Sequence, residues 1–149
     1  MNFIAHRGNM YGPNPALENR FDYIVEAYNT CGKVEIDLQT HNGVLYLGHD
    51  EPQEEVRDEI KDFITQPGVY CHSKDTESLS KLLTYGAHTF YHETDPVTFT
   101  SRGFMWCFPG VYVKDITKAI WLDMPWHPLP QKTITACFAV CGDYWAPYR

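Results

Sequence analysis

The stretch Val34-Glu35-Ile36-Asp37-Leu38 alternates apolar and acidic side chains. Its branched residues favour a β-strand, and the period of two puts Glu35 and Asp37 on the same face of that strand. Two carboxylates on an interior face repel each other and are costly to desolvate unless a cation neutralises them. The stretch therefore predicts a hard divalent cation with oxygen ligands, Mg²⁺ or Ca²⁺. The alternative is a half-exposed strand whose acids face water.

Outward from this stretch, strand and helix patterns alternate along the chain. Helices are predicted where apolar residues recur at helical spacing, over residues 21–28, 56–64 and 76–83. Gly32 and Gly86 can end the first and last of these helices. Residues 40–43, Thr-His-Asn-Gly, have the composition of a turn that can join two strands in a hairpin. Strands are predicted in short apolar or β-branched runs, namely residues 3–5, 33–39, 44–47, 68–72, 89–91, 104–108, 119–122 and 136–140.

This alternation predicts an α/β fold with a parallel sheet, in which active groups gather where strands end and loops begin. A full eight-fold barrel takes about 250 residues, whereas this chain has 149. The later connections are too short for a helix after every strand. We therefore expect a single domain over residues 1–149, a shortened or incomplete TIM-like (β/α) barrel with several helices reduced to loops.

Composition and charge exclude several classes of function. The formal net charge is −7 and no run of Lys and Arg occurs, so we expect no nucleic-acid partner. No stretch approaches the roughly 18 apolar residues of a transmembrane segment. The ionisable pair His6-Arg7 disfavours a cleaved leader. The five cysteines are odd in number and match no zinc-knuckle spacing, which favours reduced thiols and a cytoplasmic location.

Ionisable pairs follow two of the other predicted strands. His6-Arg7 comes after residues 3–5, and His49-Asp50 comes after residues 44–47. An imidazole that titrates near neutrality can act as a general acid or base, and a guanidinium offers a fork of donors to phosphate oxygens. With Glu35 and Asp37, these groups make up the set that metal-assisted phosphodiester cleavage requires. Taken singly, either histidine would more often be structural.

Four short motifs occur in an order that resembles the glycerophosphodiester phosphodiesterases, a family of phospholipase C-like barrels. They are His6-Arg7-Gly8, Glu18-Asn19, Glu35-Ile36-Asp37 and His49-Asp50. The string from Val140 to Tyr144 is also similar to the closing strand of the family, whose Asp precedes an aromatic residue. The resemblance implies the barrel fold and hydrolysis of a phosphodiester.

The chain departs from the family pattern at two places. Arg20 stands where the family has Thr after Glu-Asn. The Glu-x-Lys of the third strand corresponds to His72-Ser73-Lys74, so that an imidazole replaces an acid that binds metal in the family. Such a replacement shifts the metal preference from Ca²⁺ toward Mn²⁺ or Zn²⁺.

The resemblance implies acid–base catalysis by His6 and His49. One histidine would deprotonate a neighbouring hydroxyl of the substrate as it attacks phosphorus, and the other would protonate the leaving alkoxide. Water would then open the cyclic phosphate. The sequence does not assign the two roles. The implied substrate is a small-molecule phosphodiester of lipid metabolism.

The resemblance also implies binding roles for other residues. The metal ligands would be Glu35, Asp37 and His72, with Mg²⁺ expected and Ca²⁺ or Mn²⁺ as alternatives. Arg7 and Lys74 would bind phosphate. Residues expected around the site are Glu18, at the start of the first helix, together with His92 and Asp143. His41 and His88 are interpreted as solvent or turn residues, and the tryptophans as core and rim.

Two alternative functions remain open at this point. The first is a lipid phosphodiesterase of the sphingomyelinase or phospholipase D-like type, which shares the two histidines and Glu-x-Asp. The second is a catalytically silent module that binds a phosphorylated ligand or a partner. The short chain and His72 in place of an acid motivate the second alternative. The sequence leaves the oligomeric state open.

Overall fold

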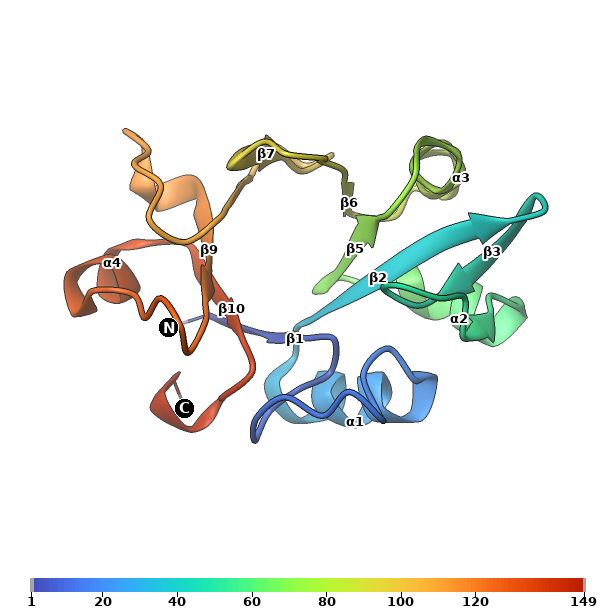
Figure 1. Cartoon of the computed structure of the whole chain (residues 1–149), viewed down its shortest axis with the longest axis horizontal. Coiled ribbons are helices and arrows are strands. Elements are labelled where there is room, and N and C mark those ends of the chain that lie inside the picture. The colour runs from blue at the N-terminus through green and yellow to red at the C-terminus, as the bar shows by residue number, and fades with distance from the viewer. Residues whose placement is uncertain (1, 149) are drawn as a thin grey trace.

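The computed structural model describes residues 2–148, which form a mixed α/β fold around one curled sheet. Parallel strands are hydrogen-bonded in the order β6-β5-β2-β1-β10-β9-β8. Their bounds are β1 Phe3–His6, β2 Val34–His41, β5 Val69–Ser73, β6 Thr89–Phe90, β8 Met105–Cys107, β9 Ala119–Asp123 and β10 Ala139–Gly142. The strands surround a common centre (Figure 1), which is consistent with the expected incomplete barrel.

Antiparallel strands are added to the parallel strands at two places. β3 (Val44–Leu47) folds back on β2, which also pairs with β1 and β5, and β4 (Glu54–Glu55) pairs with β3. β7 (Val97–Phe99) pairs with β8. The hairpin between β2 and β3 confirms the turn chemistry of Asn42-Gly43, where both residues have positive φ.

The helices lie outside the curled sheet (Figure 1). They are α1 (Phe21–Cys31), α2 (Asp58–Ile64), α3 (Thr76–Tyr85) and α4 (Gln131–Ala136), with 3₁₀ turns at η1 (Ile116–Lys118) and η2 (Ala146–Tyr148). Gly32 and Gly86 end α1 and α3 in the left-handed conformation, as the sequence predicts. None of the helices described is long and apolar enough to cross a bilayer.

The sheet buries both of its faces. Successive side chains of a strand point to opposite faces, so each parallel strand contributes to two cores. The outer core, between sheet and helices, contains Ile36 and Leu38 of β2. The inner core fills the curl of the sheet with Ile4, Tyr70, Phe90, Trp106, Ile120, Ala139 and Cys141. Glu35 and Asp37 alternate with the outer residues of β2 and so belong to the inner face.

Side-chain contacts and a backbone hydrogen bond, rather than a ladder of strand hydrogen bonds, join the two ends of the parallel sheet. Within residues 2–148, β6 pairs only with β5. The backbone of Ser101 donates a hydrogen bond to the Thr89 carbonyl at 2.7 Å, and Nε2 of His88 lies 2.7 Å from Oγ1 of Thr100. The ring of Phe90 stacks on Trp106 with centroids 4.1 Å apart. We call these contacts the seam.

Several predictions from the sequence were wrong, most of them in the second half of the chain. The last strand was predicted from Ala136, but that residue ends α4 and the strand begins at Ala139. The short strands β4 and β7 were not predicted, because neither shows clear alternation. His88 is not a solvent residue: it is 4% exposed and lies in the seam. The cysteines are all free, as expected.

Candidate active site

A cavity of about 310 Å³ opens at the carboxyl ends of the parallel strands. Its polar wall comes from residues 6–92 and contains His6, Arg7, Glu35, His49, His72, Lys74 and His92. Its apolar wall comes from the second half and contains Trp106, Phe108, Leu122, Met124 and Trp126. Of the residues predicted to be catalytic, metal-binding or phosphate-binding, only Asp37 is not part of the lining. Its carboxylate instead lies within 4 Å of three lining side chains.

Three possible metal ligands meet on the inner face of the sheet. Glu35 and Asp37 are buried side by side on β2, and β5 places His72 opposite Asp37 in the parallel register. Nδ1 of His72 lies 3.2 Å from Oδ1 of Asp37 and 3.6 Å from Oε1 of Glu35. One donor atom from each residue lies within 4.8 Å of the others. This spacing allows the three residues to share one divalent ion.

One carboxylate oxygen of this group is buried and incompletely bonded. Oδ2 of Asp37 accepts a hydrogen bond from Nδ2 of Asn19 at 2.9 Å and lies 3.0 Å from Nε of Arg7. Oδ1 of Asp37 is buried too, yet it accepts no aligned hydrogen bond from the residues described. A buried polar atom without a partner is costly. The free oxygen, with a second carboxylate and an imidazole beside it, fits a divalent cation.

The charges of this group depend on one another. Burial opposes the ionised form of Asp37, but His72 and Arg7 outweigh it and hold the pKa of that carboxyl well below its usual range. Burial also opposes the charged form of His72, whereas Asp37 and Glu35 raise the pKa of the imidazole above its ordinary value. A proton on His72 thus neutralises part of the acidic pair. A metal ion that takes Nδ1 as a ligand must displace that proton.

The end of β1 places His6 against a carboxylate that follows the neighbouring strand β10. Nδ1 of His6 lies 2.9 Å from Oδ1 of Asp143, which follows β10, the parallel neighbour of β1. Burial opposes the charged imidazole, but the hydrogen bond to Asp143 and the charge of Glu35 raise the pKa of His6. Engagement of Nδ1 by a carboxylate fixes the orientation of the ring.

A tight turn after His6 aims Arg7 at the acidic residues. Arg7 has a φ of 54°, and its N–H donates to the Glu35 carbonyl at 2.9 Å. Gly8 follows with a φ of 89°, and a Cβ there would meet the ring of Tyr23 at 2.8 Å. Nη1 of Arg7 donates to Glu18 at 3.2 Å. Nη2 is engaged by neither Glu18 nor Asp37.

The β2–β3 hairpin returns the chain to the cavity and so positions His49. Gly48 donates its N–H to the carbonyl of Asp37 at 3.0 Å. Its φ is +145°, and a Cβ would lie 2.1 Å from the carbonyl oxygen of Glu51, so only glycine fits. Nδ1 of His49 lies 2.7 Å from Oδ1 of Asp50. The side chain of His49 is 33% exposed against 15% for His6.

Lys74 and His92 complete the polar wall. Nζ of Lys74 lies 3.9 Å from Oδ1 of Asp37. The ring of His92 is parallel to that of His72, with centroids 5.0 Å apart. Burial, together with the charges of His72 and Lys74, lowers the pKa of His92. On acidification, His72 therefore takes up its proton at a higher pH than His92 does.

Two buried asparagines organise this wall, although the sequence assigned no role to Asn9 and named Asn19 only within the motif Glu18-Asn19. Asn19 makes a two-way link with Asp37, because its Oδ1 also accepts the Asp37 N–H at 2.9 Å. Nδ2 of Asn9 donates to Asp143 and to Glu18, at 2.8 Å in each case. Asn9 directly follows the motif His6-Arg7-Gly8, and this position could have indicated that Asn9 belongs to the site.

The expected position of Glu18 needs a correction. Glu18 precedes α1, which begins at Phe21, and its carboxylate binds Arg7 and Asn9. In the first turn of α1, Glu54 accepts a hydrogen bond from the Phe21 N–H at 3.1 Å, and Asp22 accepts one from the Tyr23 N–H at 2.9 Å.

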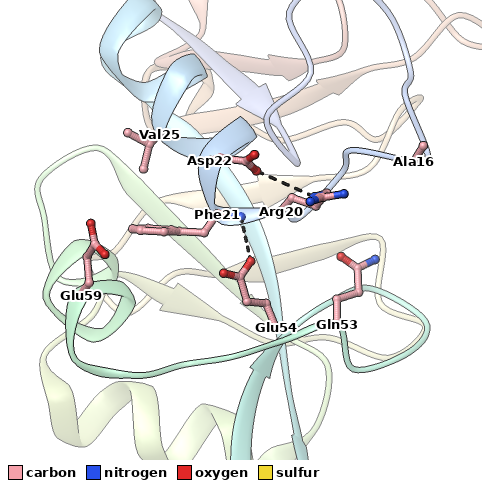
Figure 2. A pocket seen from close by; sticks show the side chains of 8 residues that line it. All are labelled: Ala16, Arg20, Phe21, Asp22, Val25, Gln53, Glu54 and Glu59. Carbon is pink, nitrogen blue, oxygen red and sulfur yellow. Dashed lines mark hydrogen bonds and ion pairs between the residues drawn. The ribbon is translucent and has the colours of Figure 1, made fainter.

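Figure 2 shows a larger groove at this start of α1, of about 880 Å³. Glu54 reaches up to Phe21 in it, and Arg20 pairs with Asp22 at 3.8 Å. None of the predicted catalytic or metal-binding residues lines the groove. Its charged side chains support the helix terminus, so size alone does not identify the functional site.

No protein-family model, curated protein or solved structure matches the chain. The chemistry of the polar wall is therefore the basis on which a function can be assigned.

Proposed function

We propose that this protein is a metal-dependent phosphodiesterase that acts on small, glycerophosphodiester-like substrates in the cytoplasm. One observation carries the proposal. His6 and His49, each held by a carboxylate, line the same 310 Å³ cavity as Glu35 and His72, which lie in one group with Asp37. The motif order that resembles the glycerophosphodiester phosphodiesterases supports the same chemistry. We further propose that the curled sheet is a TIM-like barrel shortened by the loss of helices.

The residues of the polar wall divide the work of the reaction. The positive charges of Arg7 and Lys74 attract the phosphate and stabilise the charge that develops on its oxygens. One of the two histidines takes the proton from the attacking hydroxyl of the substrate, and the other gives a proton to the leaving alkoxide. Asp143 and Asp50 fix the orientation of the two imidazoles through their Nδ1 atoms.

Glu35, Asp37 and His72 would hold the divalent cation. Mg²⁺ or Mn²⁺ suits a set of two carboxylates and one imidazole. When bound, the cation supplies Lewis-acid activation of the phosphoryl oxygen and of the attacking hydroxyl. Asn19 holds the backbone and the carboxylate of Asp37 in place for this role.

The test is hydrolysis of a glycerophosphodiester with Mg²⁺ or Mn²⁺, before and after chelation. We expect turnover that chelation abolishes and that His6→Ala and His49→Ala each reduce by about 10²- to 10⁴-fold. Asp37→Asn should weaken the binding of Mn²⁺ in calorimetry. His41→Ala is the matched control, because His41 lies exposed on the β2–β3 turn outside the cavity.

Two results would contradict the proposal. Wild-type rates in both histidine variants would exclude the acid–base mechanism. Absence of both turnover and metal binding in the folded wild-type protein would favour the catalytically silent module instead.

A further inference from the structure

The wall opposite the phosphate-binding residues is continuously apolar. Trp106 of β8 and Leu122 of β9 lie at its base, and Phe108, Met124 and Trp126 extend it along the loops that follow these strands. Exposure rises along the wall, from 4% for Trp106 to 44% for Phe108 and 65% for Trp126. The rings of Phe108 and Trp126 lie 5.7 Å apart at the rim.

This wall does not match a substrate that is polar on both sides of the phosphate. Exposed aromatic residues that continue a functional cavity are typical of a ligand-binding surface. A glycerol group would meet no hydrogen-bond acceptor of ordinary strength among these five side chains, and only the indole N–H groups of Trp106 and Trp126 as donors. An alkyl group would cover them and leave water, which is the main source of apolar binding energy.

We propose that the substrate is a soluble amphiphilic phosphodiester whose leaving alcohol carries an alkyl chain. The inference rests on the proposed function. The phosphate lies against Arg7 and Lys74, and the alkyl group lies along the apolar wall toward Trp126. The hydroxyl on the polar alcohol forms the new P–O bond, the P–O bond to the alkyl alcohol breaks, and a histidine protonates the departing oxygen.

The charge of the protein favours a dissolved substrate over one embedded in a membrane. The net charge of −7 gives no attraction to anionic lipid surfaces, which bind proteins through clusters of Lys and Arg. The aromatic rim described here is limited to Phe108 and Trp126, which suits a single chain. We therefore assign the wall to one alkyl group of a monomeric amphiphile.

The binding test compares inorganic phosphate with ethyl, butyl and hexyl phosphate by calorimetry in Mg²⁺ buffer. Each methylene that the wall covers should tighten binding roughly fourfold, the equivalent of about 0.8 kcal/mol per buried CH₂. Trp126→Ala and Phe108→Ala should flatten this dependence on chain length without weakening the binding of inorganic phosphate. Phe99→Ala is the matched control, because Phe99 is 67% exposed and lies outside the cavity. Hexyl phosphate that binds no more tightly than inorganic phosphate would overturn the proposal.

Hydrolysis separates this inference from the proposed function. In a series of glycerol alkyl phosphodiesters, kcat/KM should rise with chain length in the wild type and less steeply in Trp126→Ala. Chain-length-dependent binding without any hydrolysis would refute the phosphodiesterase and keep the ligand class. Hydrolysis that is independent of chain length would keep the phosphodiesterase and refute the alkyl substrate.

Sedimentation with phosphatidylcholine vesicles distinguishes the two sources of an alkyl chain. We expect the protein to stay in the supernatant. Cosedimentation that Trp126→Ala abolishes would assign the wall to a membrane surface and overturn the soluble substrate.

Discussion

The two halves of the curled sheet are built differently and carry different chemistry. In the first half, α1 and α3 follow β1 and β5, and the strand ends between them hold the charged and imidazole groups of the cavity. In the second half, short turns and the six-residue α4 replace such helices, and the strand ends hold aromatic and aliphatic side chains. The half backed by longer helices therefore positions the charged and imidazole groups, whereas the loop-rich half provides the apolar surface that faces them. Under the proposed function, the first half would carry the chemistry and the second would select the substrate.

The largest expected effect concerns the polar wall of the first half and decides which of the two histidines is the general acid and which the general base. A substrate with a p-nitrophenol leaving group needs little protonation of the departing oxygen, since the phenolate is stable at neutral pH. Replacing the histidine that acts as the acid by Ala should therefore reduce kcat by about 10²- to 10⁴-fold when the leaving group is an alkyl alcohol. With a p-nitrophenol leaving group, the same variant should recover most of that rate. Replacing the histidine that acts as the base should reduce kcat by the same factor on both substrates. Steady-state rates of His6→Ala and His49→Ala on the two substrates measure this, and equal losses everywhere would refute a division of roles.

The next prediction tests the seam between the halves. Burial and the charge of Arg102 lower the pKa of His88 to about 4 from its ordinary value of 6.5. The unfolded chain therefore binds a proton more readily than the folded one, so stability is complete above pH 6.5 and falls as the pH drops toward 4. Between pH 7 and 4.5 this costs about 2 to 3 kcal/mol of the free energy of unfolding.

Urea unfolding followed by tryptophan fluorescence at the two pH values measures this loss. His88→Gln should lose correspondingly less stability on acidification than the wild type, because glutamine does not titrate. His41→Gln, at an exposed histidine, should behave as the wild type. Identical acid sensitivity in His88→Gln and the wild type would show that the seam does not respond to pH.

The smallest expected effect concerns Asn9, whose hydrogen bonds hold two carboxylates of the polar wall in place. Asn9 joins the carboxylate that holds His6 to the carboxylate that holds Arg7. Asn9→Ala should reduce kcat by roughly 10- to 100-fold, as loss of a supporting hydrogen bond typically does around metal sites. Asn14→Ala is the control, because it keeps the backbone N–H that donates to Asn9. A variant that loses stability but keeps kcat would restrict Asn9 to a structural role.

The first half of the molecule was predicted well because its signals are local. The alternation in residues 34–38 placed Glu35 and Asp37 on one face, and the turn at Asn42-Gly43 predicted the hairpin that carries His49 to the cavity. Helix ends at Gly32 and Gly86 were readable because a left-handed residue favours glycine. Each of these features depends on neighbours within a few residues.

The second half was predicted less well because its strands are short and its contacts are distant. β7 has three residues and β6 two, too few for a pattern to show. His88 reads as a turn residue in the sequence, and its burial depends on Thr100 across the seam. Distance limits prediction in the first half too: Asn9 looks like a loop residue, and its hydrogen bond to Asp143 joins residues 134 positions apart.

The sequence by itself determined which titratable groups follow the strands and that Glu35 and Asp37 share one strand face, since strand periodicity and turn chemistry are local. Only the tertiary structure decided that His72 bridges the two carboxylates of β2, that Asn9 ties two ion pairs together, and that an apolar wall faces them. The reason is that these features arise from the register of parallel strands and the curl of the sheet, and both are set by contacts between residues far apart in the chain.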